Sequence, residues 1–246
     1  MTFKEYLSVI EQFIAEKAIG FSGYVLGLSG GVDSSLAAVM SKKVMGDKVL
    51  CLIMPCESIK EDAEDAVAIA KQFELSYLVI NLTDSYRLIM KEMEKAAATK
   101  GITISEAAKQ NVKVRLRMVT LYAFAQARNS LVIGTDNADE YYTGYFTKWG
   151  DGAADILPFI YLTKAEVIEA AKLYGLPDKF ADRIPSAGLY VGQTDEHDMG
   201  VTYAELDAYL LGEEVDEKVV EKIENLHRKS AHKREPIPRP IPYERE

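Results

Sequence analysis

Apolar residues are arranged along the chain in two alternating patterns. Short, nearly unbroken apolar runs at residues 24–28, 48–54, 77–82 and 131–134 predict buried strands. Helices are predicted at 36–45, 61–73, 83–98 and 105–128, and near the start, where Phe3, Leu7, Ile10, Phe13 and Ile14 recur at helical spacing. Strands and helices thus alternate from residue 20 to 135, which predicts an α/β protein with a doubly wound parallel sheet and helices on both faces.

The remainder of the chain is predicted to be a helical C-terminal part of the same single domain, 1–246. The segments TKAE at 163–166 and TYAE at 202–205 have the pattern of capping boxes that open helices. Between them, residues 183–200 are rich in glycine and predict a surface loop. Residues 231–246 form a proline-rich, locally basic tail.

Composition restricts the classes of function. The chain has 246 residues, 48% of them hydrophobic and 27% charged, as is ordinary for a globular protein, and a net charge of −9. Such an acidic protein is a poor candidate for bulk binding to nucleic acid or to an anionic membrane. Two cysteines, Cys51 and Cys56, suit a reducing compartment, and the sequence has neither a signal peptide nor an apolar run of membrane-spanning length. We therefore expect a cytoplasmic protein.

The most informative short segment is SGGVDSS, residues 29–35, which connects the first predicted strand to a helix. A helix start offers N–H groups to a phosphate, and Gly30 and Gly31 let the main chain approach it. Neither GxxxxGK[ST] nor GxGxxG is present, and residues 25–41 contain no lysine. Asp33 would repel a polyphosphate unless a metal lay between them, which predicts a Mg²⁺–polyphosphate ligand. The alternative is that Asp33 and Ser34 only cap the helix.

In parallel α/β sheets, ligands bind beyond the carboxyl ends of the strands, and residues 135–155 follow the fourth predicted strand. Glu140 in this segment is a second carboxylate that would complete a Mg²⁺ site with Asp33. Arg115 and Arg117 are two residues apart on a predicted helix, so they point in different directions.

SGGVDSS resembles the pyrophosphate-binding loop of the N-type ATP pyrophosphatases, which cleave ATP to AMP and pyrophosphate to activate an oxygen by adenylation. The segments QNVKVRLRM (110–118), GTDNADEYYTGYFTKWGDGAADILPFIYLTK (134–164) and AHKR (231–234) resemble those of the ammonia-dependent NAD synthetases within that group. The resemblance implies an adenine nucleotide alpha hydrolase-like fold and a homodimer. It also implies that ammonia amidates deamido-NAD at the expense of ATP, with Mg²⁺.

The resemblance also assigns roles to individual residues. ATP contacts are implied for Gly27, Leu28, Ser29, Gly30, Gly31, Val32, Asp33, Ser34, Thr135, Lys164 and Ser186. Deamido-NAD contacts are implied for Arg115, Lys148, Asp155, His232 and Lys233, and metal contacts for Asp33 and Glu140. Asp33, Lys164 and Asp155 are the candidate catalytic residues, Asp155 as the group that positions or deprotonates ammonium. Two segments, MPCESIKEDAEDA (54–66) and GLYVG (188–192), depart from the pattern of the family.

Two other functions stay open at the level of sequence. A tRNA-thiolating enzyme of the same group would need a sulfur-carrying cysteine pair, but Cys51 and Cys56 do not have the C-x-x-C spacing. A non-catalytic ATP sensor would not need the charged residues that accompany Asp33. The synthetase-like region occupies the whole chain, so we expect free ammonia, or ammonia from a separate protein, as the nitrogen source. Apolar residues of the helix at 105–128 suit either a dimer interface or the core.

Overall fold

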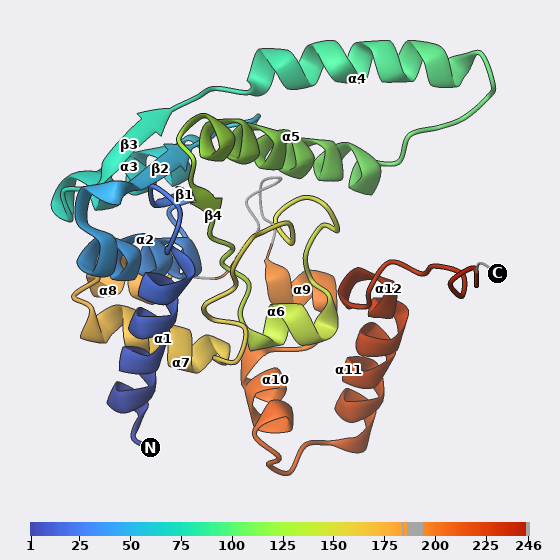
Figure 1. The fold of residues 1–246 in the computed structure, drawn as a ribbon. Coiled ribbons are helices and arrows are strands. Elements are labelled where there is room, and N and C mark those ends of the chain that lie inside the picture. Colours follow the sequence, from blue (N-terminus) through green and yellow to red (C-terminus); the bar gives the residue numbers. More distant parts are fainter. Residues whose placement is uncertain (184, 186–193, 245–246) are drawn as a thin grey trace.

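The computed structural model describes residues 1–183, 185 and 194–244. It contains a parallel sheet with helices on both faces and a helical C-terminal part, as predicted (Figure 1). The strands are β1 (Tyr24–Gly27), β2 (Val49–Ile53), β3 (Ser76–Val79) and β4 (Leu131–Val132). The helices are α1 (Phe3–Lys17), α2 (Val32–Met45), η1 (Gly46–Lys48), α3 (Lys60–Gln72), α4 (Thr83–Ala98), α5 (Glu106–Ala127), α6 (Ala138–Thr143), α7 (Lys164–Leu173), α8 (Asp178–Ala181), α9 (Asp195–Met199), α10 (Tyr203–Leu210), α11 (Glu217–Lys229) and α12 (Ala231–Arg234).

The strands lie in the order β3-β2-β1-β4, and every pair is parallel. The chain runs outward from β1 to β3 and then returns to the other side of β1 to form β4. This reversal places a topological switch point between β1 and β4, where open α/β sheets bind their ligands. The loops that follow these two strands carry the predicted phosphate-binding segment and the segment with Glu140.

The two faces of the sheet bury separate apolar clusters. Tyr24, Leu26 and Leu28 pack toward α1, α2, α3 and α7, whereas Val25 packs with residues of α4 and α5 on the opposite face. This alternation follows from the two-residue period of a strand. All five residues of β2 are buried, which is why this strand appears as a continuous apolar run.

The fourth strand is shorter than predicted, and the loop after it explains why. The backbone N–H groups of Asp155 and Ile156 donate to the carbonyl of Val132, and Ile133 forms only an isolated bridge with Ile156. The returning chain therefore takes up the hydrogen bonds that a longer β4 would make with a neighbouring strand. Gly134 is packed against this chain, because a Cβ there would lie 2.5 Å from Leu157.

The predicted caps set the starts of α7 and α10. Both capping boxes exist, with Thr163 and Thr202 each accepting from the N–H of the glutamate three residues later. Within the described ranges, no helix is long and apolar enough to span a membrane. Figure 1 shows α4 and α5 lying side by side and projecting beyond the sheet.

Candidate active site

The loop between β1 and α2 is held in shape by its own hydroxyl groups. The N–H of Gly31 donates to Ser29 Oγ at 3.2 Å, and Ser29 Oγ lies 2.9 Å from Ser34 Oγ. The hydroxyls of Ser34 and Ser35 donate back to the carbonyl of Gly31 at 3.1 and 2.7 Å. Gly31 is the N-cap of α2, and no described side chain makes a capping bond there. Asp33 therefore does not serve as the cap, and the start of α2 suits an anion.

Gly30 has a packing role, and its predicted contact with ATP stays a prediction. Its φ of +88° favours glycine, and a Cβ at this position would lie 2.8 Å from the carbonyl oxygen of Asp62. The absent side chain makes room for the backbone of α3, and Gly30 does not face the cavity described below. Gly31, the second predicted glycine, does line it.

Three charged side chains meet in front of this loop. The ammonium of Lys164 lies 2.7 Å from Asp33 Oδ2 and 3.2 Å from Glu140 Oε1. The side chain of Lys164 is only 4% exposed, and those of Asp33 and Glu140 are 16% exposed. Burial alone would lower the pKa of Lys164, but the two carboxylates raise it above its ordinary value, so the amine stays protonated. Burial raises the pKa of Glu140 to about 7 against the opposing effect of Lys164.

Helix starts bring these side chains together. Asp33 is in the first turn of α2, Glu140 in the first turn of α6, and Lys164 is the first residue of α7. Asn137 links two of the helices, because its Oδ1 accepts from the N–H of Glu140 at 3.0 Å and its Nδ2 donates to Asp33 Oδ1 at 2.9 Å. The N–H of Lys164 donates to Asp139 Oδ2 at 2.7 Å, which fixes the start of α7 against α6.

The donor set fits a magnesium ion that is completed by a substrate. Two carboxylates converge on one cationic group, the ammonium of Lys164. In the described part of the chain, no group of three or more His, Cys, Asp or Glu residues could hold a metal. Mg²⁺ is commonly bound by one or two carboxylates together with phosphate oxygens, so Asp33 and Glu140 suit a metal that arrives with a polyphosphate.

A cavity of about 1290 Å³ opens in front of the sheet at this point. The predicted residues that line it are Gly27, Leu28, Ser29, Gly31, Val32, Asp33, Ser34, Thr135, Glu140, Lys164 and Lys233. Of the other predicted residues, Gly30, Arg115, Lys148, Asp155 and His232 do not line it, and Ser186 lies outside the described residues. The cavity thus gathers most of the predicted ATP contacts and both metal candidates. Of the predicted dinucleotide contacts, Lys233 lines the cavity and the others do not.

Four of the predicted dinucleotide contacts form a group at the edge of the cavity, and one of them, Lys233, lines it. The guanidinium of Arg115 donates to the carbonyl of Lys148, at 3.1 Å from Nη2. Lys148 Nζ in turn donates to the carbonyl of His232. Lys233 Nζ donates to the carbonyls of Gly144 and Phe146 at 2.6 and 2.5 Å, so α12 packs on the segment after α6.

Asp155 lies away from this arrangement. Its side chain is exposed, and its Oδ2 accepts from the N–H of Val132 at 2.7 Å. The structure therefore places it beside β4, and its predicted contact with ammonium stays a prediction. Two other aspartates, Asp136 and Asp151, do line the cavity.

Sequence reasoning missed several residues of the cavity and the site, four of which carry charge or contact a predicted metal ligand. Asp136 is 5% exposed, and burial raises its pKa well above the ordinary range. Arg117 lines the cavity, where it donates to the carbonyl of Met54 at 3.2 Å and to Ser58 Oγ at 2.9 Å. Its separation from Arg115 confirms that the two point in different directions. The Tyr203 hydroxyl lies 3.3 Å from Glu140 Oε1, and the fourth residue is Asp151. A polar residue just after a strand was the signal available for Asp136.

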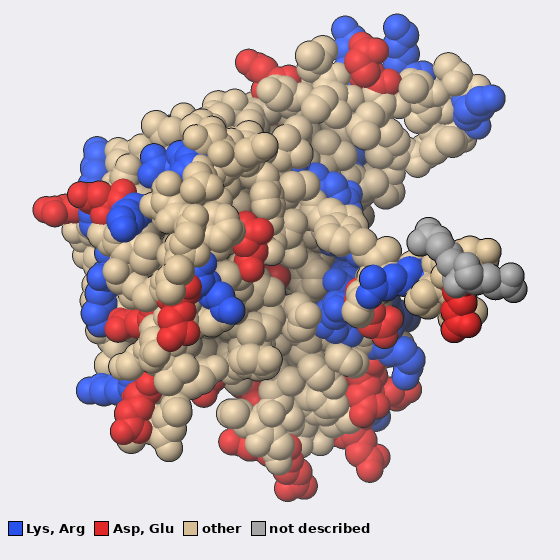
Figure 2. All heavy atoms as spheres, in the orientation of Figure 1, with Lys and Arg blue, Asp and Glu red and all other residues tan. Residues whose placement is uncertain are grey.

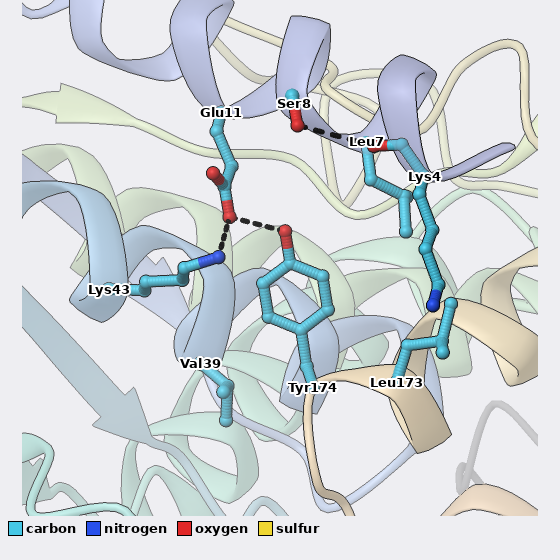
Figure 3. A pocket seen from close by; sticks show the side chains of 8 residues that line it. All are labelled: Lys4, Leu7, Ser8, Glu11, Val39, Lys43, Leu173 and Tyr174. Carbon is cyan, nitrogen blue, oxygen red and sulfur yellow. Dashed lines mark hydrogen bonds and ion pairs between the residues drawn. The ribbon is translucent and has the colours of Figure 1, made fainter. Parts of the chain in front are cut away.

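A second hollow, of about 540 Å³, lies between α1, α2 and the end of α7 (Figure 3). At its centre, Glu11 accepts from Lys43 at 2.6 Å and from the Tyr174 hydroxyl. The Lys43 ammonium also lies 4.9 Å from the ring of Tyr174. These contacts join three helices on the side of the sheet remote from α4 and α5, so the cluster is explained by packing.

The family model for NAD synthase matches residues 3–237. An NH(3)-dependent NAD(+) synthetase from Carboxydothermus hydrogenoformans is 47% identical over 213 residues, which cover 87% of this chain and 86% of the relative. A solved NMN synthetase from Francisella tularensis is 40% identical, with a TM-score of 0.90 and coverage of 98% of this chain and 99% of that one. An NH3-dependent NAD synthetase from Campylobacter jejuni, solved with nitrate, is 29% identical, with a TM-score of 0.80 and coverage of 98% and 100%. The chain belongs to the NAD synthase family.

Proposed function

We propose that this enzyme amidates the nicotinate carboxylate of deamido-NAD with ammonia, at the expense of ATP, to give NAD, AMP and pyrophosphate. The observation that carries the proposal is the convergence of Asp33, Glu140 and Lys164 at the phosphate loop, beside a cavity large enough for two substrates. A simple nucleotide sensor has no need of two buried carboxylates and a lysine at the phosphates. Family membership supplies the reaction class.

The residues of the loop act on the charge of ATP. N–H groups at the start of α2 and the hydroxyl of Ser29 face the phosphates, and Lys164 supplies a positive charge for the departing pyrophosphate. Asp33 and Glu140 would hold Mg²⁺, which neutralises charge on the phosphate oxygens. A carboxylate is a weak nucleophile, so most of the rate of adenylation comes from positioning the nicotinate oxygen in line with the α-phosphorus. AMP then leaves when ammonia forms the C–N bond.

The proton released by ammonium must pass to a base near the acyl carbon. Asp155 was predicted for this task, but its carboxylate is engaged by the N–H of Val132. Asp136 lines the cavity, and its Oδ2 has no hydrogen-bond partner among the described residues, so it is a further candidate. The proposed contacts of Arg115, Lys148, His232 and Lys233 with the dinucleotide rest on the family pattern. That of Ser186 with ATP rests on the same pattern.

A second acceptor is favoured by one observation. The Francisella tularensis NMN synthetase covers 98% of this chain with a TM-score of 0.90, and amidation that yields NMN would start from nicotinate mononucleotide. Both acceptors present the same carboxylate, so the same loop and metal candidates serve either reaction. The ratio of kcat/KM for the two acceptors distinguishes them, and we propose deamido-NAD as the better one.

The thiolation alternative finds no support in the cysteines. Cys51 and Cys56 are both buried and free. Burial raises the pKa of the Cys51 thiol to about 12 and raises that of Cys56. A thiol that resists deprotonation and contact with a partner is unsuited to carrying sulfur. Two unpaired thiols also suit the cytoplasmic location that we propose.

We also propose a homodimer, formed through the α4 and α5 side of the molecule. Exposed apolar side chains lie on β3, α4 and α5, namely Leu78, Val79, Leu88, Ile89, Met93 and Val119. Figure 2 shows charged side chains of both signs over α11 and α12 and also over the projecting end of α4. Exposed apolar side chains that gather on one face of a domain are typical of an association face.

The function is tested by incubating the protein with ATP, Mg²⁺, ammonium and each acceptor, and by measuring the amide product, AMP and pyrophosphate together. Equal amounts of all three with ammonium, and none with glutamine, are expected. AMP and pyrophosphate without the amide product would refute the proposed acceptors and leave only the adenylating chemistry.

A further inference from the structure

The ammonium of Lys164 occupies the position between the two carboxylates that a metal would need. It bonds to Asp33 Oδ2 at 2.7 Å and to Glu140 Oε1 at 3.2 Å. The other oxygen of each carboxylate faces Asn137, with Asp33 Oδ1 accepting from Nδ2 at 2.9 Å and Glu140 Oε2 accepting from N–H at 3.3 Å. All four carboxylate oxygens are therefore engaged by groups of the protein itself.

The surroundings hold the lysine in this position. The ring of Tyr203 lies 4.8 Å from the Lys164 ammonium, and its hydroxyl lies 3.3 Å from Glu140 Oε1. The ammonium of a side chain that is only 4% exposed lies between two carboxylates and offsets part of their negative charge. A divalent cation that entered the same gap would lie within a few ångströms of the positively charged Lys164 ammonium. Two positive charges at that separation repel strongly in a buried site.

We propose that Lys164 is an internal counter-ion that keeps the metal position closed in the nucleotide-free enzyme, so that a divalent cation enters only together with a polyphosphate. This inference rests on the proposed function, because it assigns the metal to Asp33 and Glu140. The phosphates of ATP carry the charge that draws the ammonium away from the carboxylates, and the vacated oxygens then accept the metal. Lys164 thus serves both as a stand-in for the metal and, after the exchange, as a partner of the phosphates.

The test uses Mn²⁺ as the probe, in the absence of nucleotide. Free Mn²⁺ is measured by electron paramagnetic resonance while it is titrated with the full-length protein. The wild type is expected to bind only in the millimolar range, and Lys164→Met is expected to bind at least tenfold more tightly. Lys172→Met is the matched control. It removes a lysine from the same helix that pairs with Asp182 at 2.7 Å, outside the site, and it should behave as the wild type.

Two further variants complete the test. Lys164→Met combined with Asp33→Asn should lose the gain in affinity, which assigns the Mn²⁺ to this pair. Lys164→Gln, which removes the charge but keeps a hydrogen-bonding side chain, should reproduce the gain. Circular dichroism confirms that each variant is folded, and Mn²⁺ should raise the thermal midpoint of Lys164→Met more than that of the wild type.

Nucleotide-free wild type that binds Mn²⁺ as tightly as Lys164→Met would overturn the inference. The absence of any gain in both Lys164→Met and Lys164→Gln would do the same. Neither result depends on turnover. An enzyme that makes NAD and yet binds Mn²⁺ freely would refute only the counter-ion role. Conversely, a chain that shows the expected Mn²⁺ behaviour but no amide product would refute only the proposed function.

Discussion

The hydroxyl of Tyr203 offers a selective way to disturb Glu140 without touching a proposed ligand. Tyr203 is 6% exposed, and its hydroxyl lies 3.0 Å from Asp195 Oδ2 and 3.3 Å from Glu140 Oε1. Burial, together with the neighbouring carboxylates, raises the pKa of Tyr203, so the phenol remains a neutral donor across the physiological range. Tyr203→Phe keeps the ring beside Lys164 and removes only this donor.

The size of the effect follows from the kind of bond that is lost. One hydroxyl hydrogen is donated to one carboxylate at a time, and a hydrogen bond to a charged group contributes about 1.5–3 kcal/mol. A change of 1 kcal/mol shifts the melting temperature of a chain of this length by about 2–4 °C, so Tyr203→Phe should melt roughly 3–12 °C lower. Loss of a group that orients a metal ligand typically weakens metal affinity about 10–100-fold, and the Mg²⁺ concentration for half-maximal rate should rise accordingly.

The assay combines differential scanning calorimetry with Mg²⁺ titrations of the initial rate. Tyr209→Phe is the matched control, because it makes the same change in the same helix, where the Tyr209 hydroxyl lies 3.1 Å from that of Tyr142. A bond between two neutral hydroxyls contributes only about 0.5–1.5 kcal/mol, and it does not involve the Glu140 carboxylate. If Tyr203→Phe and Tyr209→Phe give the same Mg²⁺ requirement, Tyr203 does not orient Glu140.

Three other predictions concern the loop, the second hollow and the pH dependence. Gly30→Ala should lower the free energy of unfolding by about 1–3 kcal/mol, since φ is +88° and its Cβ would lie 2.8 Å from Asp62 O. Gly46→Ala, where φ is +60° and no atom lies within 4 Å of the added Cβ, should lower the free energy of unfolding in urea by less than Gly30→Ala does. Equal losses for the two variants would contradict the contact of Gly30 with α3. Glu11→Gln should lower stability by about 1 kcal/mol at pH 7 without changing turnover. Burial raises the pKa of Glu11, but the contacts with Lys43 and Tyr174 outweigh burial, so the pKa is lowered. The Glu11 carboxylate therefore stabilises the fold above its ordinary pKa, and this stabilisation is lost as the pH falls through the lowered pKa of the folded state. Thermal melts from pH 7 to 3 should show the two proteins converging, and a constant difference would refute the assignment. Glu140, with a pKa of about 7 raised by burial, must lose its proton to bind Mg²⁺. The free Mg²⁺ needed for half-maximal rate should therefore rise about tenfold from pH 8 to 6, and an unchanged requirement would count against Glu140 as a ligand.

Local patterns were sufficient for the fold. The apolar runs located the strands because burial on both faces of a parallel sheet demands them, and the capping boxes located α7 and α10 because they are made by residues three apart. The predicted strand at 77–82 ends earlier, at Val79, and the predicted strand at 131–134 ends at Val132, whose carbonyl accepts from the returning chain at Asp155 and Ile156. That contact spans more than twenty residues, and no local pattern encodes it.

The site was predictable only in part, for the same reason. Asp33 was inferred from the chemistry of its loop, Glu140 from its place after a strand and from family resemblance, and Lys164 from family resemblance alone. Lys164 is 131 residues from Asp33, and Asn137 is 104 residues from it, so neither contact is visible along the chain. The packing of Gly30 against α3 is likewise a contact between distant segments, and the sequence of the loop does not reveal it.

The central claim is that the nicotinate carboxylate is activated by transfer of AMP from ATP at the Asp33 loop. The most direct measurement uses an acceptor labelled with ¹⁸O in that carboxylate, with mass spectrometry of AMP and pyrophosphate after turnover. One labelled oxygen should appear in the phosphate of AMP and none in pyrophosphate, and Asp33→Ala should form neither product. Labelled pyrophosphate, or amide product with unlabelled AMP, would contradict the acyl-adenylate and the role assigned to this site.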